Sequence, residues 1–435
     1  MQVAITGMGV VSPIGLSVAE LCEALLAGRI GIRRAPWAPP DDPRPHLFGG
    51  LDDRFEASDW MEPRVVAGTD GFARFALAAS AQALTDAGLD GGEGPGDLDP
   101  FRTGVVHGTS MGGLFSLARA QWAYDTHGAA AVDPKTMIRI WPNMAAAQIC
   151  MRHGLHGPSM TVTTACASSL DALGTAAAYL NAGQVDVVLC GATEGGFTCD
   201  GAVDAGFEPA TSQAEASYGM ETTSGDPTRA MLPFDANRSG IVSGEGSAFF
   251  VLETAEHARR RGARVHAWLR GYGSLADAHH PSSPAPDGRW EARAMAQAQA
   301  GAGVSPADVD ALVAHATGTP KGDEAEIRAI NAVFVDGNRS GAGGAADLAV
   351  TGPAVTALKG HTGHTGAASG GMNLMAGIWA MHHGRLTHVA GTTDPDPEIA
   401  FDVVLAEPRA VDVEVLQVNS FGFGGQNASV VATRS

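Results

Sequence analysis

The sequence predicts an α/β fold built from two similar halves, and three observations support it. Strand-like and helix-like runs alternate along all 435 residues. Segment 3–12 resembles segment 265–274, and an alanine-rich helix follows each after a loop, at 71–87 and 289–302. Each helix ends in a glycine turn and then meets a strand that leads into a histidine-containing turn.

These repeats suggest a seam near residue 260. We therefore expect one domain-like half at residues 1–260 and a second at residues 261–435. Two polar stretches, 36–45 and 208–229, are predicted to be long loops because they are rich in proline, or in serine, threonine and glycine.

Composition and charge exclude several classes of protein. The chain is 45% hydrophobic and 17% charged, as in ordinary globular proteins, and its formal net charge is −19. Such an acidic chain is a poor partner for nucleic acid or for an anionic membrane surface. The longest apolar run, near 372–381, is too short to span a bilayer. We expect a soluble protein with no nucleic-acid partner and no membrane partner.

The cysteines indicate a reducing compartment. Their number is odd and none forms a CxxC pair; they are Cys22, Cys150, Cys166, Cys190 and Cys199. Residues 1–6 lack the basic start of a signal peptide and are predicted to be the first strand. These features predict a cytoplasmic location.

Cys166 is the first candidate for chemistry. It lies between a short predicted strand, 158–163, and an almost uncharged, buried helix, 170–180. A thiol at the first turn of such a helix faces unpaired N–H groups and the positive end of the helix dipole, which favour the thiolate. A lone cysteine in an apolar stretch is most often an inert core residue. Its assignment therefore depends on partners elsewhere in the chain.

Three glycine-rich segments carry those candidate partners: 315–326, 359–368 and 419–427. Glycine allows backbone N–H groups to approach a ligand closely, and a histidine just after a strand can point into a pocket. Each segment alone has an ordinary explanation, such as a hydrogen-bonded core histidine for His315 or a solvated helix start for Lys359. Together with Cys166, they favour nucleophilic catalysis with base or electrophile support.

With these motifs in order, the chain resembles the chain-elongating β-ketoacyl-[acyl carrier protein] synthases of the thiolase-like superfamily. The resemblance runs from Val3 to the C-terminus. It rests on the opening 6–13, the Cys166 motif, the His315 motif, the Lys359/His364 motif and the final Gly-Phe-Gly-Gly. It implies two duplicated βαβαβαββ halves in five layers, αβαβα, and a dimer.

The resemblance also implies catalytic roles. Cys166 takes the growing acyl chain as a thioester, while His315 and His364 hold the thioester carbonyl of malonyl-carrier protein and stabilise the enolate formed on loss of carbon dioxide. Lys359 positions the histidines, and its bond to Glu326 is the supporting contact. Two histidines, rather than a histidine and an asparagine, separate elongating enzymes from acetyl-CoA-primed initiators.

Substrate contacts follow from the same resemblance. The backbone N–H groups of Cys166 and Phe423 form an oxyanion hole, Thr317 and Thr319 touch the phosphopantetheine arm, and Met111 and Phe423 line or gate the acyl pocket. The implied reaction is a decarboxylative Claisen condensation with malonyl-[acyl carrier protein], which gives 3-oxoacyl-[acyl carrier protein]. No cofactor or metal is expected, because substrates arrive on the phosphopantetheine of an acyl carrier protein. The partner is a second copy or a homologous chain-length factor.

The chain departs from the family pattern in three places. His315 precedes Ala-Thr-Gly-Thr instead of Gly-Thr-Gly-Thr, and Lys359 precedes Gly-His-Thr-Gly-His, which adds a second histidine, His361. We choose His364 by its spacing from Lys359. The stretch from Glu208 is longer than expected, which points modestly to a type II polyketide or polyene pathway over fatty-acid synthesis. Few basic residues surround the expected carrier-docking region, so Arg64 and Arg74 are its candidates.

Four other interpretations of the sequence are possible. Gly108-Thr109-Ser110-Met111-Gly112 fits the nucleophile elbow of a serine hydrolase with Ser110 as nucleophile. A dinucleotide fold is weaker, because Gly7-x-Gly9 is followed by Ser12. A metal site at His361 and His364 with His382 and His383 lacks a carboxylate or thiolate ligand. A scaffold subunit would bind a partner without becoming acylated.

Overall fold

The computed structural model describes residues 2–38, 41–42, 44–90, 98–197, 210–336 and 352–435. Its main feature is an eleven-stranded mixed sheet in the order β12-β10-β9-β14-β15-β8-β1-β7-β6-β4-β5. The strands are β1 (Val3–Val11), β4 (Thr103–Gly108), β5 (Ser159–Val162), β6 (Val187–Glu194), β7 (Gly246–Thr254), β8 (Ala267–Ala276), β9 (Ala311–Val313), β10 (Ala354–Thr356), β12 (Asp402–Val403), β14 (Val415–Gly422) and β15 (Gln426–Arg434).

The strand order repeats about the centre of this sheet. The order β5-β4-β6-β7-β1 in the N-terminal half matches β10-β9-β14-β15-β8 in the C-terminal half. The two halves meet where β1 pairs antiparallel with β8. The duplicated α/β fold predicted from the sequence is confirmed. The division at residue 260 stays a prediction, since the sheet continues across it.

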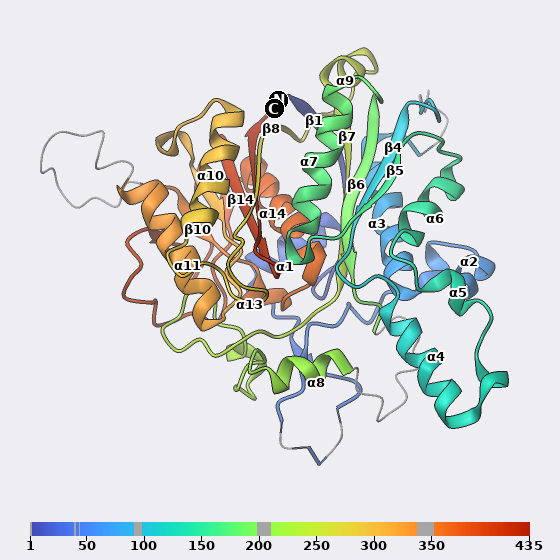
Figure 1. The fold of residues 1–435 in the computed structure, drawn as a ribbon. Helices are drawn as coiled ribbons and strands as arrows, with labels where there is room; N and C mark the ends of the chain where they lie inside the picture. Colours follow the sequence, from blue (N-terminus) through green and yellow to red (C-terminus); the bar gives the residue numbers. More distant parts are fainter. Residues whose placement is uncertain (1, 39–40, 43, 91–97, 198–209, 337–351) are drawn as a thin grey trace, which may run out of the picture.

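Helices complete five layers, αβαβα (Figure 1). The central helices α7 (Ser168–Asn181) and α14 (Ser369–His383) pack against each other and against β6 and β14, respectively. One outer layer contains α3 (Gly71–Ala87) with α6 (Met144–His153), and the other contains α10 (Arg289–Ala302) with α11 (Pro320–Ile330). Residues of both halves contribute to the central hydrophobic core, so the halves stabilise each other.

Glycines in β1 and β8 explain the repeat seen in the sequence. A Cβ atom on Gly9 would lie 2.1 Å from the carbonyl oxygen of Ala79 in α3, and one on Gly273 would lie 2.2 Å from that of Ala294 in α10. Gly7 makes an equally close approach to α3. These glycines therefore allow a helix to lie directly on the strand. The dinucleotide-binding reading of Gly7-x-Gly9 is wrong, because the two glycines face a helix.

One loop prediction is confirmed and one is corrected. The described residues of 36–45 contain no helix or strand and connect β2 (Arg33–Arg34) to β3 (Leu47–Phe48). The described part of 208–229 instead contains α8 (Ala210–Ser217) and a 3₁₀ turn. Alanines give this segment helix propensity, and Arg44 bonds Gln213 of the helix at 2.6 Å. Residues 208 and 209 lie outside the described residues.

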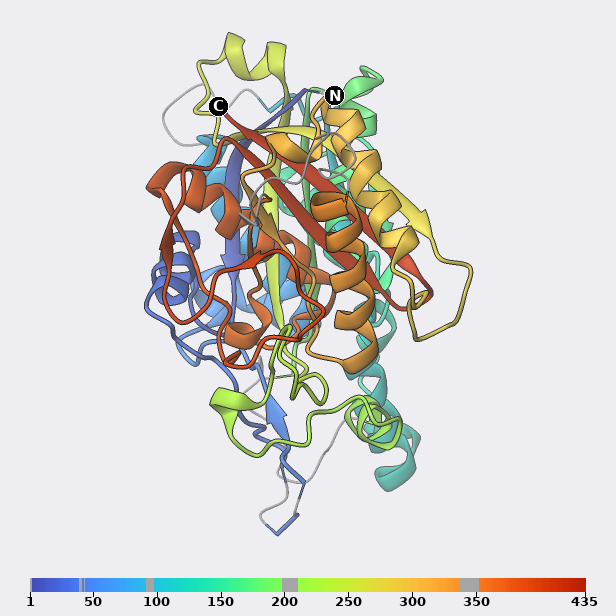
Figure 2. The same cartoon turned by 90° about the vertical axis from the view of Figure 1, so that its left-hand side faces the viewer.

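The remaining elements are short or peripheral. They are α1 (Val18–Leu26), α2 (Pro63–Gly68), α4 (Leu114–His127), α5 (Thr136–Arg139), α9 (Ala255–Arg260), α13 (Lys359–Thr362), β11 (Arg385–Leu386) and β13 (Arg409–Ala410). Both termini lie at one end of the molecule and α8 lies at the other (Figure 2). Within the described ranges, no helix is long and apolar enough to cross a membrane.

Candidate active site

Cys166 lies at the junction between β5 and α7, in the 3₁₀ turn Ala165–Ala167. Its sulfur is 3.0 Å from Nε2 of His364, and its carbonyl oxygen accepts a 2.7 Å hydrogen bond from the Ser420 hydroxyl. The preceding residue, Ala165, has a φ of +50°, a conformation that costs energy for a non-glycine residue. The strained conformation of Ala165 and the bonded carbonyl of Cys166 thus hold the thiol beside His364.

His364 follows α13 and precedes the first turn of α14. Its Nδ1 lies 3.1 Å from the hydroxyl of Ser369, which in turn lies 3.0 Å from the Thr365 hydroxyl. When Nδ1 carries the hydrogen and donates it to Ser369, Nε2 is free to accept the Cys166 proton. We assign this tautomer from the hydrogen bonds.

His315 comes directly after β9, in a turn held by one carboxylate. Glu326 accepts the backbone N–H of His315 at 2.9 Å and that of Ala316 at 2.6 Å. The amide of Asn419 also donates to Glu326, at 3.3 Å. Ala316, where the resemblance leads us to expect glycine, has a φ of +39°. This network keeps the turn in its strained conformation.

Lys359 bonds His315 and not Glu326. Its Nζ lies 3.2 Å from Nδ1 of His315 and also donates to the carbonyl oxygen of the same residue. The predicted Lys359–Glu326 bond is therefore wrong, because the carboxylate is occupied by backbone N–H groups. With Nδ1 accepting from the ammonium group, the ring carries its hydrogen on Nε2.

The three reacting groups converge. The sulfur of Cys166 and a ring nitrogen of each histidine lie within 4.8 Å of one another, and the two rings are 5.5 Å apart at 79°. Among the described residues, this is the one group of His, Cys, Asp or Glu close enough to hold a metal ion. In each histidine, Nδ1 is bonded to a neighbour: Ser369 for His364 and Lys359 for His315. The Nε2 atoms are left to face the substrate, which suits acid–base or electrostatic catalysis.

Burial controls the protonation of the site. Desolvation raises the pKa of Cys166 to about 12, although the charge of Lys359 opposes the rise. Desolvation, together with Lys359, holds the pKa of His315 and that of His364 well below the ordinary value. A backbone N–H lowers the pKa of Cys166, as expected at a helix end, but desolvation is the larger effect in the free site. The resting pair is a thiol and a neutral imidazole.

The supporting charges are also shifted by burial. Desolvation lowers the pKa of Lys359 to about 8, against the opposing charge of Glu326. Desolvation raises the pKa of Glu326 to about 7, against the backbone hydrogen bonds that lower it. At neutral pH the lysine is therefore mostly a cation, and it can donate to His315.

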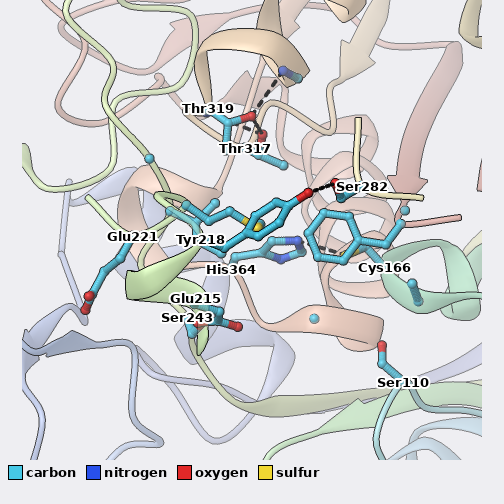
Figure 3. A pocket seen from close by; sticks show the side chains of 18 of the residues that line it. Ser110, Cys166, Glu215, Tyr218, Glu221, Ser243, Ser282, Thr317, Thr319 and His364 are labelled. Atoms are coloured by element: carbon cyan, nitrogen blue, oxygen red, sulfur yellow. Dashed lines mark hydrogen bonds between the residues drawn. The ribbon is translucent and has the colours of Figure 1, made fainter. Parts of the chain in front are cut away.

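A pocket of about 480 Å³ surrounds the site (Figure 3). All four predicted contact residues line it: Met111, Thr317, Thr319 and Phe423. The Thr317 and Thr319 hydroxyls are 2.9 Å apart, and Tyr218 reaches across to Ser282 at 2.7 Å.

The pocket also has an aromatic end. Trp37, Phe48 and Phe197 pack there with ring centroids 4.8–5.7 Å apart, and all three line the pocket. The apolar rings suit an acyl chain.

The last glycine-rich segment approaches the nucleophile. A Cβ on Gly422 would lie 2.9 Å from the backbone nitrogen of Cys166, so a side chain there would displace the turn. Phe423, the next residue, is 48% exposed and forms part of the pocket wall. Its predicted role with Cys166 in an oxyanion hole stays a prediction.

The structure separates the other sequence candidates from the site. The ring of His361 is buried between the carbonyl oxygens of Arg29 and His388, at 2.9 and 3.0 Å. His382 bonds the carbonyl of His266, and His383 stacks on Trp379. The proposed four-histidine metal site is therefore wrong.

The carrier-docking candidates differ from each other. Arg74 is buried, with its guanidinium donating to the Thr69 carbonyl at 2.8 Å, so its predicted role in docking is wrong. Arg64 is exposed and pairs with Glu62 at 2.7 Å. Arg64 stays a prediction.

Ser110 lines the pocket beside the carboxylate of Glu194, not beside a histidine. Its backbone N–H donates to Glu194 at 2.9 Å, and no histidine bonds it in the described part of the chain. The buried carboxylate of Glu194 also accepts the N–H of Met111, at 3.2 Å. The serine-hydrolase interpretation therefore lacks the histidine that a Ser-His-Asp/Glu triad requires.

Sequence reasoning missed three supporting residues: Ser369, Ser420 and Glu194. Ser420 lies in a segment already singled out, and Ser369 follows His364 by five residues at the start of a helix. Their hydroxyls could have been suggested as partners of the reacting residues. Glu194 ends β6 and gave no local signal.

Comparison with known proteins agrees with this geometry. The family models described as "Beta-ketoacyl synthase, N-terminal domain" and "Beta-ketoacyl synthase, C-terminal domain" match residues 1–258 and 266–393. The chain is 33% identical to 3-oxoacyl-[acyl-carrier-protein] synthase 2 of Synechocystis sp. over 429 residues, 99% of this chain and 97% of the relative. It is also 33% identical to the enzyme of that name from Staphylococcus aureus, over 99% of this chain and 98% of the relative.

Solved structures give the same answer. The ishigamide ketosynthase/chain length factor superposes with a TM-score of 0.87 at 29% identity, covering 100% of this chain and 99% of the other. A β-ketoacyl synthase from Burkholderia phymatum STM815 superposes with a TM-score of 0.86, with the same identity and coverage. The chain belongs to the β-ketoacyl synthase family, an acyltransferase-type family of condensing enzymes.

Proposed function

We propose that the protein catalyses decarboxylative condensation of an acyl-enzyme thioester with malonyl-[acyl carrier protein], giving 3-oxoacyl-[acyl carrier protein]. The observation that carries this proposal is the 3.0 Å contact between the Cys166 sulfur and Nε2 of His364, beside a His315 whose ring is held by Lys359. Such a site can supply both a nucleophile and two N–H donors.

The first half-reaction loads the acyl chain. His364 removes the proton from Cys166 as the sulfur attacks the thioester carbonyl of the acyl-carrier protein. The backbone N–H groups of Cys166 and Phe423 stabilise the resulting oxyanion. The carbon–sulfur bond to the carrier then breaks, and the carrier sulfur leaves with the proton from His364.

The second half-reaction forms the carbon–carbon bond. The thioester carbonyl of malonyl-carrier protein accepts hydrogen bonds from Nε2–H of His315 and of His364. The bond to the carboxylate breaks, carbon dioxide leaves, and the enolate carbon attacks the acyl group on Cys166. The Cys166 sulfur departs as a thiolate, and one proton taken up from solvent restores the thiol.

Ser369 lets His364 serve both steps. A hydroxyl can accept from Nδ1–H, which leaves Nε2 as a base, or donate to Nδ1, which makes Nε2–H a donor. Lys359 keeps the His315 hydrogen on Nε2 throughout. Because both histidine pKa values are held well below the ordinary value, both rings stay neutral at physiological pH.

Substrates are expected on the phosphopantetheine arm of an acyl carrier protein, with no further cofactor. The arm would pass Thr317 and Thr319, and the acyl chain would extend past Met111 toward the aromatic end of the pocket. Phe423 would gate the passage. A cytoplasmic location suits such partners.

A second chain completes the proposed assembly. Large hydrophobic residues are exposed across α4, α5, α6 and β5: Leu114, Leu117, Trp122, Tyr124, Met137, Ile138, Trp141, Met151 and Met160. Helices α4 and α5 stand out from the body of the molecule (Figure 1), and β5 is an edge strand of the sheet. Apolar patches and open strand edges of this kind favour association.

We propose a type II polyketide pathway, with a homologous chain-length factor as the partner, over a homodimer in fatty-acid synthesis. The structural likeness to the ishigamide ketosynthase/chain length factor and the altered Lys359 motif support this choice. Purification with and without a co-expressed homologue, followed by a condensation assay with malonyl-carrier protein, tests it. A stable, active homodimer would reject the polyketide version, and absence of condensation by either form would reject the reaction.

A further inference from the structure

Glu291 is a buried carboxylic acid that the proposed mechanism does not use. It lies in the first turn of α10, is 2% exposed, and lines the same pocket as Cys166. Its Oε2 atom is buried and has no hydrogen-bond partner among the described residues. A buried polar atom without a partner destabilises a protein, so its presence needs a reason.

The N-terminal half provides an internal control for this position. The glycines of β1 and β8 make matching contacts with Ala79 of α3 and Ala294 of α10. Glu291 lies three residues before Ala294, and Ala76 lies three residues before Ala79. Ala76 is therefore the residue of α3 that matches Glu291, and it is fully buried. Helix–sheet packing at this position is therefore satisfied by alanine, and the fold does not require a carboxyl group.

The surroundings decide which hydrogen bond Glu291 can offer. Burial raises its pKa well above the ordinary value, and the nearby charges of Glu326, Asp277 and Asp323 add to the rise. Each of these three neighbours already accepts backbone N–H bonds. Burial and these charges therefore favour the protonated carboxyl of Glu291, and its unpartnered oxygen suits an acceptor such as a carbonyl oxygen.

Glu291 lines the same pocket as Thr317 and Thr319, the two residues expected to touch the carrier arm. Thr317, Thr319 and Ser282 line the same pocket (Figure 3). Phosphopantetheine contains two amides, and hence two carbonyl oxygens without charge. We propose that Glu291 is a substrate-positioning residue whose carboxyl group donates a hydrogen bond to an amide carbonyl of the phosphopantetheine arm. This inference rests on the proposed function.

The test compares acylation of Cys166 in the parent protein, Glu291→Ala and Glu291→Gln. Two donors are used: hexanoyl-pantetheine, which has both amides, and S-ethyl thiohexanoate, which has none. Intact-protein mass spectrometry follows the rate. With hexanoyl-pantetheine, Glu291→Ala is expected to be about tenfold slower at low donor concentration, the loss of about one hydrogen bond. Glu291→Gln retains an N–H donor and should stay within about threefold of the parent.

With the ethyl thioester, all three proteins should react at equal rates. Because alanine occupies the matching position, Glu291→Ala should also unfold at a temperature no lower than the parent. Equal loss with both donors, a lowered unfolding temperature, or no loss with hexanoyl-pantetheine would overturn the inference. If the parent itself is not acylated by any donor, including acyl-carrier proteins, the proposed function fails instead.

Discussion

The neutral thiol–imidazole pair makes a specific prediction about the pH dependence of Cys166 alkylation. The pKa of Cys166 is raised to about 12, and that of His364 lies well below its ordinary value. Neither group changes its charge between pH 6.5 and pH 7.5, below the pKa of about 8 at which Lys359 loses its charge. The parent should therefore react with iodoacetamide at a nearly constant rate over that range, within about threefold. The His364 nitrogen, 3.0 Å from the sulfur, takes the proton as the thiol reacts.

Replacing His364 by alanine removes that route. Alkylation must then proceed through the free thiolate, whose fraction at pH 7.5 is about 3 × 10⁻⁵ for a pKa of about 12, against about one tenth for an ordinary cysteine. The rate should fall accordingly and rise about tenfold per pH unit. Intact-mass kinetics, corrected with Cys166→Ala for the other thiols, measure it. A parent rate that rises about tenfold per pH unit between pH 6.5 and pH 7.5 would refute the reasoning.

Further predictions concern the histidines, the lysine and the fold. His364→Ala should stop malonyl decarboxylation, as measured by release of labelled carbon dioxide, and should slow acylation of Cys166 as well, because the same base is lost; normal release would remove its assigned role. Lys359→Met should raise the pKa of Cys166 further and release His315 from its tautomer, slowing condensation more than about a hundredfold; an unchanged rate would contradict this. Gly9→Val should destabilise the fold by about 3 kcal/mol in denaturant unfolding, because its Cβ would meet the Ala79 carbonyl; an unshifted midpoint would show that α3 can move away.

Local patterns predicted much of the fold and the reacting groups. The helices at 71–87 and 289–302 have the bounds expected from the sequence, and a glycine in the left-handed region ends each of them. The grouping of Cys166 with His315 and His364 was implied by the family resemblance, and the structure brings the three side chains together. The duplicated topology followed from the two glycine-containing strands.

Features set by tertiary contacts were missed. The helical period of 71–87 gives no sign that Arg74 points inward. There its guanidinium donates a hydrogen bond to the carbonyl oxygen of Thr69. Likewise, desolvation raises the pKa of Cys166 and so favours the thiol. The extent of desolvation depends on packing from both halves, which the sequence does not give. The partner of Lys359 could not be predicted, because it depends on the hydrogen bonds of Glu326. That carboxylate accepts the backbone N–H groups of His315 and Ala316, eleven and ten residues earlier in the chain.

The two halves differ in the role of the histidine at the matching strand end, and the sequence does not reveal this difference. His107 and His315 occupy matching strand ends, yet the His107 ring stacks on Phe249 at 5.9 Å, and neither of its nitrogens has a partner among the described residues. Burial lowers the pKa of His107 to about 3. One histidine of the pair fills the core and the other faces the pocket.

The central claim is that Cys166 carries the acyl chain. Intact-protein mass spectrometry after incubation with a panel of acyl-carrier proteins tests it most directly, with Cys166→Ala as the matched control. The account predicts a mass gain of one acyl group in the parent and none in the variant. An equal gain in both would contradict it, and no gain in the parent, even with a co-expressed homologous subunit, would identify a non-catalytic scaffold instead.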